Sequence, residues 1–282
     1  MRHLLALAVL LLTVTYAPAE PTRNEPSRYL WTSRPDPANA LAVRIAPPPG
    51  FQRTPTEVGS FANWLRYLPL KPGRPPVLLF DGRQKSNQNA HWAVIDMDVG
   101  DKDLQQCADS VIRLRAEYLL SAGKTGDIAF TLTNGHKAAF ADWAAGQRPT
   151  VENNRVTWRK SAQPDSSHRS LRRYLDFVYA YAGTLSLSRE LKAVGEHEPI
   201  EAGDVFIHGG SPGHVVIVLD TATNPTTHHR VFLLAQGYMP AQEMHVLKNP
   251  NSESLSPWYD ADFAETLTTP EWVFKRGEHK HF

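Results

Sequence analysis

Hydrophobic and polar positions fall into blocks along this chain, and the clearest block covers residues 200–220. Residues 205–207 are apolar, residues 209–213 read Gly-Gly-Ser-Pro-Gly, and residues 215–219 are apolar without a break. A Gly/Pro cluster between two apolar runs indicates a tight turn that joins two strands. A strand that is apolar at every position suits burial on both faces, so we expect the second strand at the centre of a sheet.

Two helices are indicated by spacing and by their boundary residues. Apolar residues recur at three- and four-residue steps over 104–118, which predicts a helix of about 18 residues that ends near Gly123. A second helix is expected over 60–68, with Ser60 as its N-cap and Pro69 as its stop.

The remaining patterns predict shorter elements. We expect an edge strand at 41–45, further strands at 77–80, 91–99, 128–132 and 230–236, and helices at 137–145, 170–181 and 186–194. The stretch 146–168 is polar, the stretch 237–282 is rich in Pro and aromatic residues, and both are expected to be mostly loop. Helices and short strands come first and antiparallel strands follow, an order typical of the α+β class. We predict an antiparallel sheet with helices packed on one side and a loop-rich C-terminal tail.

The N-terminal residues change the picture of where the protein acts. Residues 1–19 have a basic start, an apolar centre and the small-residue site Ala-Pro-Ala, which is typical of a secretory signal peptide. We expect cleavage near Ala19, a Pro-rich extended arm at 20–50, and a single domain at 51–282. Removal of 1–19 takes away Arg2 and no acid, so the formal charge of +1 becomes 1 − 1 = 0. A neutral, exported chain without a later apolar run of ~20 residues indicates no transmembrane segment and no nucleic-acid partner.

The chain has a single cysteine, Cys107, near the start of the predicted long helix. A helix N-terminus favours thiolate over thiol, and His214, at the start of the buried strand, could be its base. Gln236 ends the next predicted strand and could orient that ring, as could Asp220 or His208. The alternative is structural: Cys107 shares a helix face with apolar residues, and His214 could do no more than hydrogen-bond the turn.

The segment Gly203-Asp204-Val205-Phe206 with Gly213-His214-Val215-Val216-Ile217 resembles the histidine motif of NlpC-type and CHAP-type papain-like cysteine peptidases. This resemblance implies a papain-like (NlpC-like) fold, here with a helical insertion between cysteine and histidine. It implies the roles of nucleophile for Cys107, base for His214 and third catalytic residue for Gln236. Gln105 or Gln106, beside the thiol, could donate to an oxyanion.

Nearly the whole predicted mature chain also resembles a bacterial family defined only as a domain of unknown function, number 4846. The stretches that carry this likeness are 60–70, 103–119, 203–220, 235–250 and 256–259. The likeness supports the architecture and implies no established activity.

Other residues give weaker signals. Tyr238, Trp258 and Tyr259 could line a substrate groove, with core packing as the ordinary alternative. The pair His228-His229 lacks further ligands at metal-binding spacing, so we expect no metal and no cofactor.

These patterns and resemblances predict an exported thiol hydrolase of amide bonds. Its partner would be a peptide or a peptidoglycan-like substrate, such as cell-wall peptide. The alternative is a non-catalytic binding protein of the cell envelope on the same scaffold, in which Cys107 is structural.

Overall fold

The computed structural model describes residues 28–195 and 198–282. The predicted signal peptide and the first part of the predicted arm, up to residue 27, lie outside the described residues. Within them the chain forms a nine-stranded antiparallel sheet in the order β2-β11-β10-β9-β8-β15-β7, with β1 paired to β9 and β12 paired to β10. These strands are β1 (Gln52–Arg53), β2 (His91–Val94), β7 (Lys192–Ala193), β8 (Val205–His208), β9 (His214–Thr223), β10 (Arg230–Gln236), β11 (His245–Leu247), β12 (Trp258–Asp260) and β15 (His279–His281).

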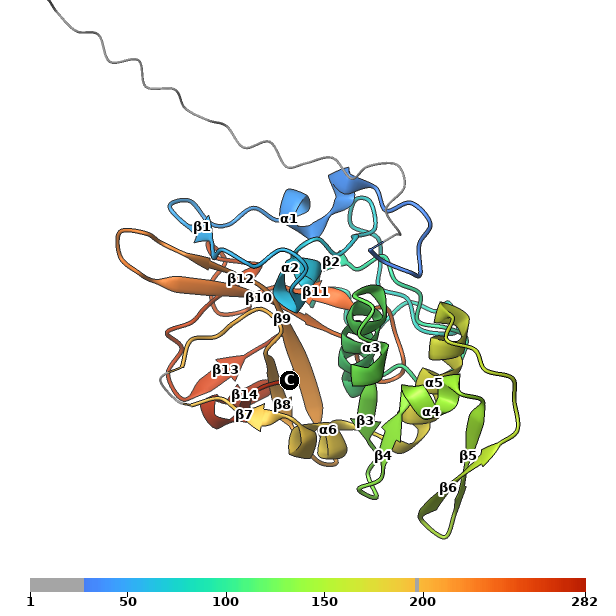
Figure 1. Cartoon of the computed structure of the whole chain (residues 1–282). Helices are drawn as coiled ribbons and strands as arrows, with labels where there is room; N and C mark the ends of the chain where they lie inside the picture. Colours follow the sequence, from blue (N-terminus) through green and yellow to red (C-terminus); the bar gives the residue numbers. More distant parts are fainter. Residues whose placement is uncertain (1–27, 196–197) are drawn as a thin grey trace, which may run out of the picture.

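Six α-helices and three two-stranded ribbons surround this sheet in the described part of the chain (Figure 1). The helices are α1 (Leu41–Arg44), α2 (Phe61–Arg66), α3 (Cys107–Ser121), α4 (Phe140–Ala144), α5 (His168–Tyr181) and α6 (Thr184–Glu190). The ribbons are β3 (Ala129–Thr131) with β4 (Lys137–Ala139), β5 (Gln147–Glu152) with β6 (Arg155–Lys160), and β13 (Thr266–Thr268) with β14 (Val273–Lys275). None of the described helices combines the length and the apolar character needed to cross a membrane.

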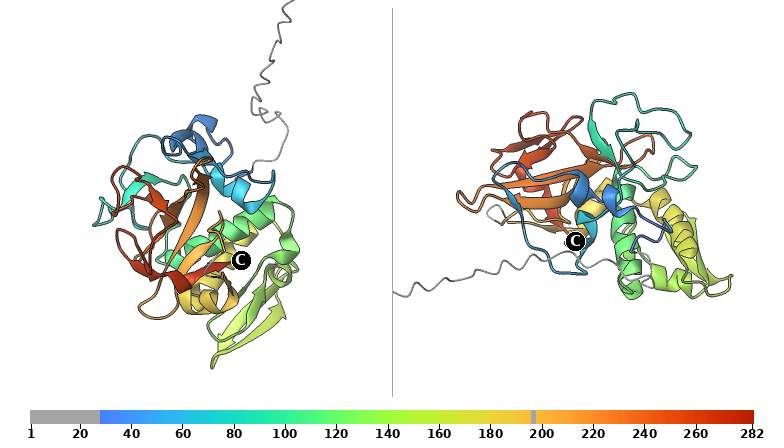
Figure 2. Two further views of the ribbon diagram at one scale, coloured as in Figure 1. Left: turned by 90° about the vertical axis from the view of Figure 1, so that its left-hand side faces the viewer. Right: turned by 90° about the horizontal axis from the view of Figure 1, so that it is seen from above.

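Strand β9 lies at the centre of the sheet, as the unbroken apolar run predicts. Its side chains alternate between two cores, because successive residues of a strand point to opposite faces. Val215, Ile217 and Leu219 join the core that includes residues of all six helices. Val216 and Val218 join a smaller core on the other face, which the β13–β14 ribbon covers. The α+β class is therefore confirmed, with helices α3, α4 and α5 gathered on one side of the sheet (Figures 1 and 2).

Both strongly predicted helices are present, and each begins with a polar side chain at a backbone N–H. In α2 the Ser60 hydroxyl accepts from the Asn63 backbone N–H at 3.1 Å, which confirms it as the N-cap. In α3 the Asp109 carboxylate accepts from the Gln106 backbone N–H at 3.1 Å. Cys107 is consequently the first residue of α3.

Several weaker predictions are wrong. Residues 41–44 form helix α1 instead of an edge strand, and 77–80 make only isolated bridges at Leu78 and Leu79. The stretch 146–168 contains the β5–β6 ribbon, whereas the tail is loop-rich as predicted, with the short strands β11 to β15. Strands β5 and β6 pair with each other across the turn at Asn153 and Asn154, and their few apolar residues make the alternation weak.

The predicted arm is part of the domain from residue 28 onward. Tyr29, Leu41 and Ile45 are buried in the main core. Arg53 on β1 also binds the buried carboxylate of Asp220 on β9, with Nε 2.7 Å from Oδ2. The segment is thus fixed by core packing and by a charged contact.

Candidate functional site

The start of α3 lies against the start of β9 and the end of β10. Gly237, directly after β10, makes this close approach possible. A side-chain carbon at this position would lie 2.2 Å from Ser110 Oγ and 2.9 Å from the Gln106 carbonyl oxygen. Only a residue without Cβ fits there, so Gly237 brings Gln236 beside the first turn of the helix.

Cys107 is partly buried at this junction. Burial raises the pKa of its thiol to about 11, and the negative charge of Asp109 adds to the rise. The backbone N–H groups of Cys107, Ala108 and Val215 act in the opposite direction without cancelling it. Val215 follows His214, so the thiol faces the peptide next to the histidine.

The His214 ring is buried, with 1% of the residue exposed. Its Nε2 lies 2.8 Å from Gln236 Oε1. Aromatic rings surround it: Tyr238 at 4.8 Å, Trp272 at 5.4 Å and Phe274 at 5.9 Å between ring centres. Burial lowers the pKa of His214 to about 4, although the Gln236 hydrogen bond and the Glu271 charge favour the protonated ring.

The fold therefore brings Cys107, His214 and Gln236 to one place, from one helix and two adjacent strands. Within the described residues, the thiol makes no direct hydrogen bond to the imidazole. At pH 7 both groups are neutral, because the pKa of the thiol is raised and that of the ring is lowered. The sequence-based expectation of a thiolate at the helix N-terminus is thus wrong for this state, because burial outweighs the helix end.

Glu271 and Lys85 form an ion pair on the side of Gln236 that faces away from His214 in the hydrogen-bond chain. Gln236 Nε2 donates to Glu271 Oε2 at 2.6 Å, and Lys85 Nζ donates to Glu271 Oε1 at 2.8 Å. The Lys85 ammonium also lies 4.8 Å from the centre of the Tyr238 ring. His214, Gln236, Glu271 and Lys85 form a continuous chain, which we call the His214 relay.

Comparison with known proteins gives a family. The sequence model described as "Domain of unknown function (4846)" matches residues 41–281. The chain belongs to this family. No curated protein matches the chain, and no solved structure matches it.

In this member of family 4846, two alternative partners of His214 are occupied elsewhere. Asp220 binds Arg53 and Arg66. His208 Nδ1 lies 2.5 Å from Glu278 Oε1. Of the three candidate partners, Gln236 is therefore the one that hydrogen-bonds the His214 ring.

The two predicted oxyanion residues differ in whether their donor group is engaged. Gln105 is 1% exposed, and its Oε1 accepts from Arg113 Nη1 at 2.7 Å in a polar cluster between α3 and α5. Gln106 donates through Nε2 to Asp103 Oδ1 at 3.0 Å. The Gln106 donor is therefore used by Asp103, whereas Gln105 Nε2 is buried and has no hydrogen-bond partner among the described residues.

The predicted aromatic groove is corrected in part. Trp258 and Tyr259 are each 1% exposed and pack in the two cores of the sheet. They offer no surface to a substrate. Tyr238 is partly exposed and lies on the His214 ring, so it is the one predicted aromatic residue at the site.

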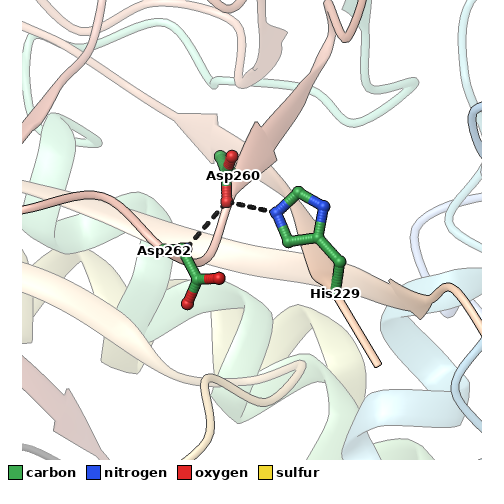
Figure 3. Close-up of side chains that lie close together, drawn as sticks. All are labelled: His229, Asp260 and Asp262. Carbon is green, nitrogen blue, oxygen red and sulfur yellow. Dashed lines mark hydrogen bonds and ion pairs between the residues drawn. The ribbon is translucent and has the colours of Figure 1, made fainter. Parts of the chain in front are cut away.

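One cluster with metal-ligating side chains lies away from the His214 relay (Figure 3). His229, Asp260 and Asp262 are brought together by the pairing of β10 with β12, which the sequence does not reveal. The His229 Nε2 atom is already bonded to Asp260 Oδ1 at 2.7 Å, and all three side chains are partly or fully exposed. This arrangement is explained by a surface ion pair.

Glu271, Lys85 and Trp272 were not predicted as site residues. They come from the loop before β2 and from the tail, far from His214 in sequence. A lone acid or lysine in a loop gives no local signal. Only the packing of the tail onto the sheet places them at the site.

Proposed function

We propose that this protein is a thiol hydrolase of amide bonds, with Cys107 as nucleophile and His214 as base. One observation carries the proposal: the ring of His214 is anchored by Gln236 while the peptide that follows it faces the Cys107 thiol. A nucleophile at a helix start, a base on a strand and a third polar residue on the next strand agree with the papain-like arrangement that the sequence resembles. We propose that fold relation as well.

The chemistry starts from a neutral pair. As sulfur attacks the amide carbonyl, the thiol proton passes to His214 Nδ1, and the C–N bond then breaks as the ring returns that proton to the leaving amine. An acyl group remains on Cys107 as a thioester. His214 next takes a proton from water, which attacks the thioester carbonyl. The C–S bond then breaks, the carboxylic acid leaves, and the ring returns its proton to the Cys107 sulfur.

The substrate class follows from the resemblance and from the predicted export. NlpC-type enzymes act on cell-wall peptide, so we propose a peptide or peptidoglycan-like amide as the substrate. Tyr238 and Trp272 are partly exposed rings that contact the His214 ring, and we propose that they contact the acyl part of such a substrate.

The first test measures alkylation of Cys107 by iodoacetamide from pH 5 to 10 in wild type, His214→Gln and His208→Gln. We expect His214→Gln to slow alkylation at neutral pH at least about tenfold, because a base that takes the thiol proton is lost. His208→Gln is the matched control, since His208 lies across the same turn and contacts Glu278 instead. Equal rates in all three proteins would contradict the proposed role of His214.

The second test uses soluble peptidoglycan fragments. Wild type should release new amino groups from them and accumulate an acyl adduct on Cys107 that mass spectrometry detects after acid quenching. Cys107→Ala should do neither. Amine release that persists in Cys107→Ala would remove the cysteine from the mechanism.

A binding protein is the second candidate, and one observation favours it: the thiol and the ring are both neutral and share no direct hydrogen bond. A cavity of about 280 Å³ elsewhere, lined in part by Phe206, Phe263 and Arg276, gives a binding protein a place for a ligand. For this candidate, Cys107→Ala would bind the same fragments as wild type, and wild type would leave them intact.

A further inference from the structure

The His214 relay contains an amide whose orientation is determined by its neighbours. Gln236 Nε2 lies 2.6 Å from Glu271 Oε2, and a carboxylate oxygen can only accept. The same Nε2 lies 3.4 Å from His245 Nε2. His245 Nδ1 lies 2.9 Å from the Glu243 carbonyl oxygen, so Nδ1 of that ring donates and Nε2 accepts. Two acceptors thus face the Gln236 amino group.

Turning the Gln236 amide over would place its oxygen against the Glu271 carboxylate. Two acceptors at hydrogen-bond distance repel each other, and a buried pair of this kind is costly. The Gln236 oxygen is therefore held toward His214, at 2.8 Å from Nε2. An oxygen acceptor at this distance requires the proton of the neutral ring to be on Nε2, which leaves the lone pair on Nδ1.

We propose that Glu271, held in place by Lys85, is a positioning residue that sets the tautomer of His214 through the Gln236 amide. The use of this tautomer rests on the proposed function, since Nδ1 must be the free base that receives the Cys107 proton. Neither Glu271 nor Lys85 contacts the reacting atoms. They act through Gln236.

Lys85 makes this arrangement stable. Its side chain is 5% exposed and that of Glu271 is 12% exposed, so each charge would be poorly solvated alone. The ammonium has donors only and takes one carboxylate oxygen, while Gln236 takes the other. Asn87 adds a donor to the same oxygen as Lys85, at 3.3 Å.

The charged and titratable groups around His214 come from five parts of the chain. Glu271 favours its protonated ring and Lys85 disfavours it, so the two charges oppose each other at His214. Cys107 on α3, Tyr238 after β10 and His245 on β11 complete the surroundings. The tautomer is therefore controlled by hydrogen-bond direction and not by a net charge.

The test is the ¹⁵N signal of the His214 ring in protein labelled on histidine, at neutral pH. The signal is assigned by its disappearance in His214→Gln. We expect the wild-type ring to carry its proton on Nε2. A wild-type ring protonated on Nδ1 would overturn the proposal without any variant of Glu271.

Two variants test the cause. In Glu271→Gln, Lys85 should take the new amide oxygen, so that the new amino group faces Gln236 and turns its amide over. We expect the His214 signals to shift toward the Nδ1-protonated form and Cys107 alkylation at neutral pH to fall at least about tenfold.

The variant Lys85→Met/Asn87→Ala/Glu271→Gln should restore the wild-type tautomer. Both donors that face the far oxygen of residue 271 are then removed, so the introduced amide is free to offer its oxygen to Gln236. A purely structural role for Glu271 would give no such rescue. Glu278→Gln is the control, since Glu278 contacts His208 and not the relay. Unchanged His214 signals in folded Glu271→Gln would overturn the proposal.

The two proposals fail separately. If His214→Gln leaves Cys107 alkylation unchanged while Glu271→Gln still switches the ring signals, the thiol hydrolase is wrong and the positioning role of Glu271 stands. If the ring signals do not change in Glu271→Gln but alkylation depends on His214, the positioning role of Glu271 is wrong and the thiol hydrolase proposal stands.

Discussion

At the scale of single residues, burial decides the protonation of the candidate site. Cys107, His214 and Asp109 all lie in the junction between α3 and the sheet, and for each the neutral form is favoured. Burial raises the pKa of Asp109 to about 8, against hydrogen bonds that favour its charged form. Its Oδ1 atom has no partner among the described residues, while Oδ2 accepts from the Gln106 backbone. A charged Asp109 would also oppose a thiolate at Cys107.

Replacement of Asp109 by Asn tests this at residue scale. The unfolded Asp109 loses its proton near pH 4 and the folded one near pH 8, so wild type loses stability as the pH rises through this window. We expect Asp109→Asn to match wild type near pH 4 and to be more stable at pH 8.5 by on the order of a few kcal/mol. The pKa of Cys107 should fall below its wild-type value. Urea unfolding and the pH dependence of alkylation measure the two effects.

The matched control is Asp101→Asn, because Asp101 is exposed in the loop before the same helix. It should change neither quantity. Equal behaviour of Asp109→Asn and wild type at pH 8.5 would show that burial does not hold this proton.

At the scale of elements, β9 connects the site to the N-terminal segment. It begins with His214 and carries Asp220 six residues later, fully buried. The Asp220 carboxylate lies 2.7 Å from Arg53 Nε of β1 and 2.7 Å from Arg66 Nη2 of α2. One carboxylate therefore ties the strand, the helix and the segment before it together.

We expect Asp220→Ala to lower the free energy of unfolding by about 3–5 kcal/mol, because two arginines would lose their buried partner. Asp260→Ala is the control: its carboxylate pairs with His229 at the surface (Figure 3), and an exposed pair contributes less than about 1 kcal/mol. Chemical denaturation at pH 7 measures both. A loss for Asp220→Ala as small as that for Asp260→Ala would contradict this account of the buried triad.

At the scale of the whole molecule, the two-sided sheet buries titratable groups whose linkage gives the protein a pH optimum of stability. Burial lowers the pKa of His245 to about 3 and that of His214 to about 4. Both rings stay neutral in the folded state while the unfolded chain takes up protons below pH 6.5, so stability falls with the pH there. Asp109 has the opposite effect on the free energy of unfolding: between about pH 4 and 8, its contribution makes stability fall as the pH rises.

These three groups predict maximal stability near pH 6–7. Below this pH, unfolding takes up two protons on the two histidines and releases one from Asp109. The net uptake of one proton lowers the free energy of unfolding by roughly 1.4 kcal/mol for each pH unit of decrease. Urea unfolding at pH 7, 6 and 5 measures the slope. His245→Gln should reduce the proton uptake that sets this slope by about one proton. His228→Asn, at an exposed position with φ of 59°, should leave the slope unchanged. A wild-type slope near zero between pH 5 and 6.5 would contradict the prediction.

The order of residues was sufficient to predict the elements that depend on local chemistry. The unbroken apolar run at 215–219 specified a strand buried on both faces, and Ser60 and Pro69 bounded a helix. The spacing over 104–118 specified α3, and the short apolar run at 231–235 specified β10, whose bounds of 230–236 agree with the structure. In these cases one period or one cap is enough, because the spacing of apolar residues and the boundary residues already distinguish a helix from a strand.

The tertiary structure alone decided which side chains meet. Gln236 reaches His214 only through the pairing of β9 with β10, and Glu271 reaches Gln236 only because the tail packs on the sheet. The same packing buries Trp258 and Tyr259, which the sequence left open as groove residues, and it keeps Cys107 and His214 neutral. Contacts between distant residues and the loss of water depend on the whole fold, so no local pattern encodes them.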